Sequence, residues 1–150
     1  MKNYLFALFF LLAAFTATTS AQRNVTPAID RDPILEQDAK HNLDVARQAF
    51  LLKKAYKGVL MRFEETYAAY PTFSQIEEFL YLAGMSSYYL SENKGKQKID
   101  RKNERDTEKF APAKLRLDAK AYLSLLLERN PQTKYRDDAE RTLKLLGPTS

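Results

Sequence analysis

Few residues in this 150-residue sequence could carry out acid–base or metal chemistry. His41 is the one histidine, and cysteine is absent. A metal site built from histidine and cysteine is therefore excluded by count, and we expect neither a metal nor another cofactor. A serine–histidine–aspartate triad would have to use His41, and no Gly-x-Ser-x-Gly motif accompanies it. With Asp38 and Asp44 three residues to either side, His41 is typical of an exposed helical surface.

The carboxylates include three adjacent pairs, at Glu64-Glu65, Glu77-Glu78 and Asp137-Asp138. Neighbouring residues on a helix point in different directions, so none of these pairs forms a shared acid–base site. The sequence also lacks a glycine-rich phosphate-binding loop. We therefore expect a protein that is not an enzyme. An exported helical hydrolase or lyase is the alternative, and a cleft of acids around His41 would favour it.

Tyrosine is the residue type in excess, with nine copies against no tryptophan. Aromatic side chains mostly fill cores, so packing between helices is the first interpretation of this group: Tyr67, Tyr70, Tyr81, Tyr88, Tyr89 and Tyr122. Neighbours lie about 100° apart on a helix, so Tyr88 and Tyr89 cannot both lie on one buried stripe. We expect one of them to be exposed on the wall of a groove, where tyrosine offers an apolar body and a polar tip.

The beginning of the chain has the pattern of a secretory signal peptide. Lys2 precedes an apolar run of twelve residues from Tyr4 to Phe15, and the small residues up to Ala21 fit a cleavage site before Gln22. Twelve apolar residues are too few to span a bilayer, which takes about 20. We expect residues 1–21 to be removed and the mature chain to be exported to the periplasm. Its 23 basic and 19 acidic residues are interspersed, which is not the pattern of a nucleic-acid-binding surface.

Helical periodicity accounts for the remainder, and no run of β-branched residues predicts a strand. After a flexible segment over residues 22–32, Asp32-Pro33 is a typical helix start. The polar stretch 53–58 predicts a turn between the first helix and the second. Ser74 with Glu77 predicts a capping box at the start of the third helix. Two further helices follow, and the last ends near Gly147, so the sequence predicts an all-α domain over residues 33–147.

Residues 92–112 form a charged insertion between the third and fourth helices. Ile99 and Phe110 are its only strongly apolar residues. Such a segment buries too little apolar surface to offset the entropy lost on ordering. It is therefore predicted to be a mobile loop or a solvated extension of a helix, and a basic docking strap is the functional alternative.

Two breaks, at Tyr70-Pro71 and Asn130-Pro131, interrupt the helical pattern in the same way, 60 residues apart. Regularly spaced breaks are typical of stacked helical hairpins, and a plain up-and-down bundle is the alternative. We counted the packing offsets of a tetratricopeptide repeat from Leu43 and Leu80, and back from Pro131. They place apolar, small or proline residues at the expected positions: Leu43, Ala46, Phe50, Val59, Phe63, Pro71, Leu80, Ala83, Gly84, Ala119, Leu123 and Pro131. Arg47 and Thr66 depart from this pattern. The sequence thus predicts about two hairpins and a C-terminal closing helix.

Three segments carry a resemblance to a family: KAYKGVLMRFEETYAAYP, EEFLYLAGMSSYYLSE and AKAYLSLLLERNPQTKYRDDAERTLKLLG. Over residues 40 to 147 the chain resembles the BamD-type outer-membrane assembly lipoproteins, in a short form without the lipidated cysteine. The resemblance implies a helical-repeat protein of the periplasm, peripheral to the outer membrane. It also implies a role in outer-membrane protein assembly or cell-envelope maintenance, through the binding of partner subunits and extended client segments.

In stacked hairpins the first helices line a concave face, and such faces bind proteins. In this register eight residues point inward: His41, Asp44, Gln48, Leu51, Glu78, Tyr81, Met85 and Tyr88. Tyrosines and a methionine among polar groups are typical of a peptide-binding hot spot. Since about three units are needed for a stable stack, a bound partner or a second copy of the chain is expected to complete it. The sequence therefore predicts a non-enzymatic periplasmic scaffold or adaptor for proteins or extended peptides. We expect no nucleic-acid partner and no membrane span after signal cleavage.

Overall fold

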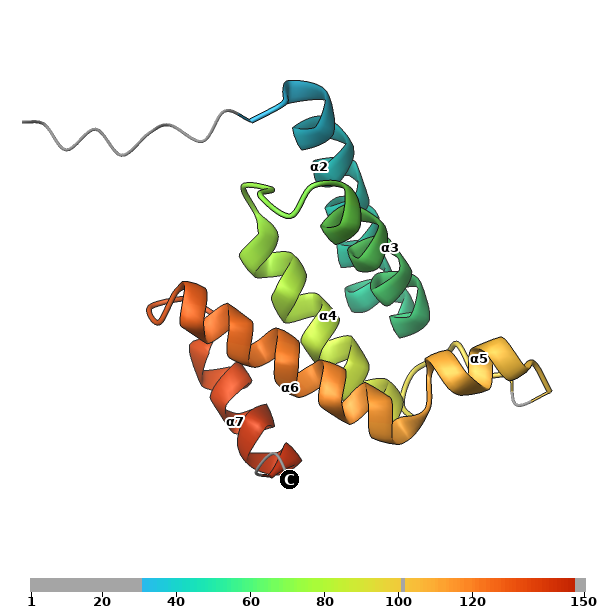
Figure 1. Ribbon diagram of the computed structural model, residues 1–150. Coiled ribbons are helices and arrows are strands. Elements are labelled where there is room, and N and C mark those ends of the chain that lie inside the picture. Colours follow the sequence, from blue (N-terminus) through green and yellow to red (C-terminus); the bar gives the residue numbers. More distant parts are fainter. Residues whose placement is uncertain (1–30, 101, 148–150) are drawn as a thin grey trace, which may run out of the picture. The chain divides into compact units, whose positions relative to one another are not determined.

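The computed structural model describes residues 31–100 and 102–147, and all the regular structure in these ranges is helical. The long helices pack antiparallel (Figure 1). They are α2 (Pro33–Gln48), α3 (Tyr56–Ala69), α4 (Ile76–Ser91), α6 (Pro112–Arg129) and α7 (Arg136–Leu146), with a short α5 (Glu104–Lys109). The prediction of an all-α fold is confirmed for this part of the chain. The expected signal peptide, its cleavage site and most of the expected flexible segment lie outside the described residues.

Helix α2 begins where its sequence predicts. The Asp32 carboxylate accepts hydrogen bonds from the backbone N–H groups of Ile34 (2.8 Å) and Leu35 (3.3 Å), and Pro33 occupies the first turn. At its other end α2 continues into a π-helical turn, η2 (Ala49–Lys53). Lys54 then takes a left-handed conformation with φ of 48° and ends the helix. The predicted turn between the first two helices is therefore confirmed.

The two proline breaks are equivalent in their hydrogen bonds. At the first, the backbone N–H of Tyr70 bonds to the carbonyl of Thr66, and Phe73 bonds back to Tyr70 and Ile76 to Phe73. At the second, sixty residues on, Asn130 bonds to Leu126, and the same two steps follow through Thr133 and Arg136. Proline lacks an amide hydrogen, so it fits the position at which the helix stops. The prediction that Pro71 and Pro131 mark matching turns is confirmed.

The predicted capping box at Ser74 and Glu77 is wrong. Helix α4 starts at Ile76, and its N-cap residue Gln75 makes no side-chain capping bond. The Ser74 hydroxyl instead donates to the Glu36 carboxylate on α2. Glu77 accepts a 3.0 Å hydrogen bond from the amide of Asn130. Both side chains therefore join neighbouring turns and helices, which sequence spacing alone does not reveal.

Helix α4 lies at the centre of the fold and packs against α2, α3, α6 and α7. Its closest approach is to α6, where a Cβ built on Gly84 would lie 2.7 Å from the Leu123 side chain. Small residues on both helices, Ala83 and Ala119, are fully buried beside this contact. Of the predicted repeat positions other than the two prolines, all are buried except Phe50, which is half-buried.

The charged insertion is only partly as expected. Helix α5 buries no residue, so it is solvated as expected, but it is a separate short helix and not an extension of a neighbouring one. Phe110 directly after it is 3% exposed and belongs to the core, and Ile99 packs against that core. Lys57 on α3 forms an ion pair with Asp106 on α5. The expectation that the segment buries too little apolar surface to be ordered is therefore wrong at Phe110. Phe110 and Ile99 are enough to attach this polar segment to the core.

We predict that Gly84→Ala destabilises the fold by about 1–3 kcal/mol, because α4 and α6 must move apart to accommodate the methyl group. Urea or thermal unfolding measures this loss. Gly58→Ala on α3 is the control, since its nearest neighbour would be a Gln97 side-chain oxygen at 3.8 Å. That variant should be neutral or slightly more stable, because alanine favours helix over glycine by about 1 kcal/mol. Equal effects of the two substitutions would contradict a close contact at Gly84.

We also predict that Phe110→Ala costs about 3 kcal/mol in the free energy of unfolding, as expected for truncation of a buried phenylalanine. Arg105→Ala on the exposed α5 is the matched control and should change stability by less than about 0.5 kcal/mol. A loss at Phe110 as small as that at Arg105 would mean that the segment is not anchored to the core.

Candidate functional site

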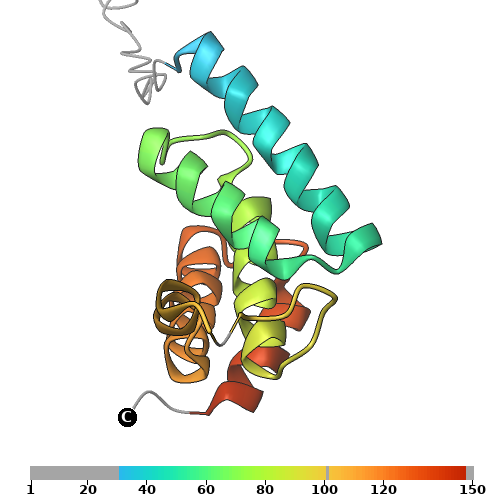
Figure 2. The same ribbon diagram turned by 90° about the vertical axis from the view of Figure 1, so that its right-hand side faces the viewer.

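Helices α2, α4 and α7 lie next to one another, with α4 in contact with both of the others. Helices α3 and α6 lie on the opposite side of the fold (Figure 2). We call the surface formed by α2, α4 and α7 the first-helix face. His41, Asp44 and Gln48 are exposed on α2, and Leu51 is exposed on η2. On α4, Glu78, Tyr81 and Tyr88 are half-buried and Met85 is buried. The structure therefore places the predicted binding residues on neighbouring elements, and it leaves only the four from the first hairpin exposed.

An arginine network joins α2 to α4 at the middle of this face. Arg47 donates two hydrogen bonds to the Glu78 carboxylate, at 2.6 and 2.7 Å, and one of 2.6 Å to Asp44. The Gln75 side chain accepts a further bond of 3.0 Å. The hydrogen bonds from Arg47 lower the pKa of Glu78, and the same bonds raise the pKa of Arg47. In the sequence Arg47 is only a departure from the repeat pattern, and local spacing does not reveal that it links two helices.

A tyrosine pair joins α4 to α7. The rings of Tyr81 and Tyr135 stack with centroids 4.2 Å apart, and the Tyr81 hydroxyl donates to Asp138 at 3.2 Å. Burial and the negative charge of Asp138 raise the pKa of Tyr81. Beneath this pair the sulfur of Met85 accepts a hydrogen bond from Thr142 at 3.4 Å. Met85 is only 6% exposed, so its predicted place on an open groove is wrong: α7 covers it.

An aromatic cluster lies near the end of α2. Phe50, Tyr56 and Tyr89 have ring centroids 5.1 to 6.1 Å apart, and Tyr88 adjoins Tyr89 at 5.6 Å. The amine of Lys94 lies over the rings of both Tyr88 and Tyr89. Burial raises the pKa values of Tyr56 and Tyr89. Tyr88 and Tyr89 are both half-buried, so the two are not both fully buried, as their adjacency predicts, but neither is the exposed tyrosine expected on a groove wall.

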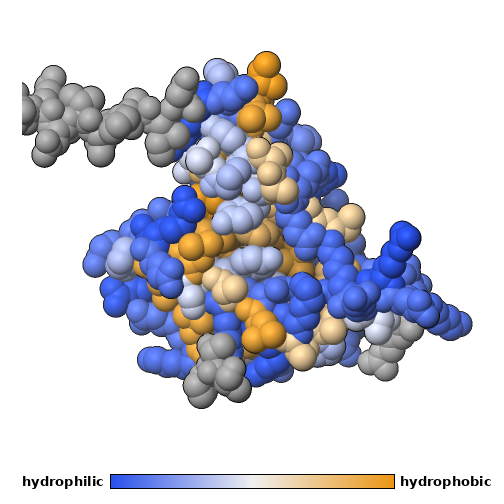
Figure 3. Space-filling model, in the orientation of Figure 1, coloured by the Kyte–Doolittle hydropathy of each residue, from blue (hydrophilic) through white to orange (hydrophobic). Residues whose placement is uncertain are grey.

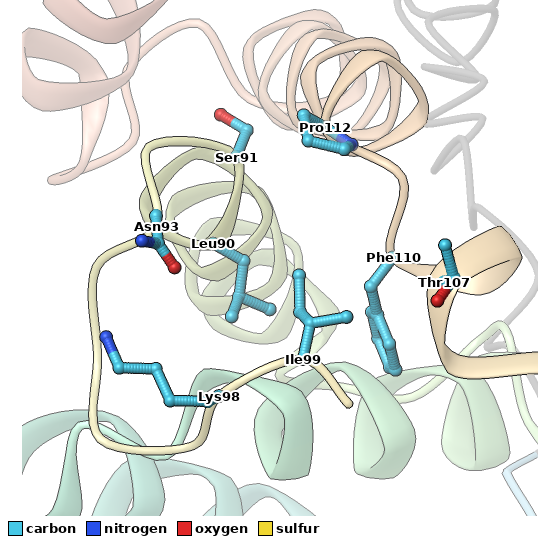
Figure 4. Close-up of a pocket in the computed structure, with 8 residues that line it drawn as sticks. All are labelled: Leu90, Ser91, Asn93, Lys98, Ile99, Thr107, Phe110 and Pro112. Atoms are coloured by element: carbon cyan, nitrogen blue, oxygen red, sulfur yellow. The ribbon is translucent and has the colours of Figure 1, made fainter. Parts of the chain in front are cut away.

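A cavity of about 480 Å³ opens between the end of α4 and the charged insertion. Leu90, Ile99 and Phe110 point toward one another at its centre (Figure 4). The rest of the lining is Pro112 and four polar residues, Ser91, Asn93, Lys98 and Thr107. Sequence analysis did not predict this cavity. The signal for it was the pair of apolar residues, Ile99 and Phe110, within an otherwise charged segment.

Hydrophobic surface also occurs away from the predicted binding residues. Figure 3 shows hydrophobic colour at the top of the view, over the N-terminal end of α2, and in the middle of the view between α3 and α6. At the N-terminal end of α2, Ile34 is 71% exposed. Hydrophobicity alone therefore does not select one binding surface, and the arrangement of the helices is needed as well.

The groups that could carry out acid–base chemistry are dispersed. Glu77, Glu78 and Asp138 are each bonded to a different partner, as the adjacent-pair argument predicts. Within residues 31–100 and 102–147, no ion pair joins His41 to a carboxylate. In the same ranges, no three histidine, aspartate or glutamate side chains gather in a way that could hold a metal ion.

Comparison of the chain with protein-family models, curated proteins and solved structures finds no match. The resemblance to BamD-type lipoproteins therefore stays a prediction. Of the helices that the structure describes, none is long and apolar enough to cross a membrane.

We predict that Glu78→Gln lowers stability by about 1 kcal/mol near neutral pH, because the charge-assisted bonds to Arg47 are lost. The pKa of Glu78 is lower in the folded chain than in the unfolded one. Its ionised form therefore stabilises the fold above the unfolded value of about 4.3, and this contribution disappears as the pH falls through the lower folded value. Urea unfolding of both proteins at pH 7 and at pH 3 should show the difference shrinking in acid.

Glu140→Gln provides the control for this substitution. Glu140 pairs with Arg136 on the surface of α7, with both side chains more than 40% exposed. Exposed pairs of this kind contribute less than about 0.5 kcal/mol. A Glu78→Gln effect no larger than that of Glu140→Gln would show that the Arg47 network does not stabilise the packing of α2 against α4.

Proposed function

We propose that this protein is a periplasmic scaffold that binds other proteins or extended peptides on the first-helix face. The observation that carries the proposal is the pair of equivalent turns at Pro71 and Pro131. They bring α2, α4 and α7 next to one another, with exposed polar residues on α2 and half-buried tyrosines on α4. Extended surfaces built from consecutive helices are used for protein recognition in stacked helical arrays.

The helices in the described part of the chain support a tetratricopeptide-like arrangement of hairpins. In this proposal α2 and α3 form the first hairpin, α4 and α6 form the second with α5 inserted between them, and α7 closes the stack. The burial of the predicted repeat positions is consistent with that register. Gly84 also fits, because a glycine is needed where α6 approaches α4.

The ligand that suits the face is an extended segment with polar and aromatic side chains. His41, Asp44 and Gln48 offer exposed polar groups along α2, and Tyr88 offers a partly exposed ring on α4. Tyrosine is among the residue types that contribute most of the binding energy in many interfaces. We also propose a role in outer-membrane protein assembly or in maintenance of the cell envelope. This part of the proposal rests on the resemblance to BamD-type lipoproteins.

The experiment is affinity capture of envelope proteins on the chain that begins at Gln22, followed by a comparison of variants for each captured partner. We expect His41→Arg with Gln48→Arg to reduce capture at least tenfold, because two bulky charges then occupy the exposed stripe of α2. Circular dichroism should show an unchanged melting temperature, since both residues are exposed.

Met61→Arg with Ala68→Arg is the matched control, because it adds the same charge to exposed positions on α3. Capture by this variant should equal that of the unmodified chain. If both variants lose the partner equally, or if neither loses it, the first-helix face is not the binding surface.

A further inference from the structure

The tip of the first helical turn exposes two adjacent leucines. Leu51 is 66% exposed and Leu52 is 74% exposed, although both lie within the π-helical turn that ends α2. Their neighbour Phe50 points into the aromatic cluster with Tyr56 and Tyr89. The turn at Lys54 then reverses the chain toward α3. Two large apolar side chains are therefore held at a sharp turn with nothing from the described chain to cover them.

Five lysines lie on this turn and on a loop that is hydrogen-bonded to it. Lys53 and Lys54 follow directly in the sequence, and a loop carrying Lys94, Lys96 and Lys98 packs against the same turn. The backbone N–H of Lys96 donates to the carbonyl of Lys54 at 2.9 Å, and the Gln97 side chain accepts from the N–H of Gly58 at 3.0 Å.

All five lysines are exposed. In the part of the chain that the structure describes, no salt bridge pairs any of them with a carboxylate. We call residues 50–54 together with residues 94–98 the basic tip. Its positive charge is therefore not neutralised by ion pairs within the described fold.

We propose that the basic tip docks the protein on an anionic lipid surface, with Leu51 and Leu52 inserted among the lipid headgroups and the lysines against the lipid phosphates. Charge complementarity selects this partner, because the five lysines match a negatively charged headgroup layer. The leucines decide between a membrane and other polyanions, since nucleic acid or an acidic peptide has no acyl layer to receive them. This docking is independent of the scaffold role, because the aromatic cluster, not a partner protein, holds the tip in place.

The expected binding is weak and reversible. A lysine near an anionic membrane strengthens attachment about fivefold, and each partly inserted leucine adds about tenfold. Attachment should therefore fall steeply as salt is raised, because the headgroup charge is screened.

Tryptophan fluorescence tests the insertion directly, because the chain contains no tryptophan. Leu52→Trp is made in the chain beginning at Gln22, which retains the whole compact unit from Arg31 onward. On vesicles with about one-third phosphatidylglycerol in phosphatidylcholine, its emission should shift to the blue and be quenched by brominated acyl chains. Leu117→Trp, at an exposed site on α6, is the control and should show neither change.

Vesicle co-sedimentation measures the contributions of the side chains. Leu51→Ser with Leu52→Ser should lower partitioning onto the same vesicles at least tenfold, whereas Leu117→Ser with Leu145→Ser, two other exposed leucines, should not. Lys53→Gln with Lys96→Gln should lower it more than tenfold, and Lys40→Gln with Lys144→Gln about twofold at most. Pure phosphatidylcholine vesicles should retain little protein.

Three results would overturn the proposal. They are no binding to the anionic vesicles, equal quenching at positions 52 and 117, or vesicle binding that Leu51→Ser with Leu52→Ser leaves unchanged. In the last case, equal retention on heparin would identify a general polyanion site. Thermal melts show whether each variant is folded. The fluorescence test uses the tryptophan variants, so it remains valid if a serine variant has a lowered melting temperature.

Discussion

The close approach of α4 and α6 at Gly84 is the constraint on which the remaining packing depends. Helix α4 contacts α2, α3, α6 and α7, so its distance from α6 sets the positions of the others. Small buried residues on α4, including Ala83, Ser86 and Ser87, permit this approach along more than one turn. Side chains as large as Leu123 then fill the space that those residues leave, which gives a close-packed centre without tryptophan or disulfides.

Polar contacts across the first-helix face fix the order of the helices laid against that centre. Arg47 reaches from α2 to α4, and Tyr81 reaches from α4 to α7. Each is directional, so each sets the rotation of a helix more sharply than apolar contact does. The same contacts occupy groups that could otherwise bind a partner. The part of the face left open is the exposed stripe of α2 together with Tyr88, and this narrows the surface on which a client would lie.

The two proposed surfaces are close together on the molecule. Leu51 was assigned to the binding face from sequence register, and in the structure it forms part of the basic tip. Within the tip, Phe50 contacts Tyr89, and this contact connects the tip to α4. A protein attached to an anionic lipid surface through this tip would hold the first-helix face near that surface. Such an arrangement requires no membrane-spanning helix.

The sequence by itself determined the helices, the two equivalent turns and the buried positions between them. These follow from local rules: apolar spacing defines a helical stripe, Asp32 caps a helix, and proline stops one. It could not assign Ser74 and Glu77, because their partners Glu36 and Asn130 lie far along the chain. Only the tertiary structure decided that Met85 is covered by α7, that Phe110 joins the core, and that a lysine-bearing loop is hydrogen-bonded to the turn that carries Leu51 and Leu52. Each of these depends on which distant surfaces meet, and periodicity along one helix does not contain that information.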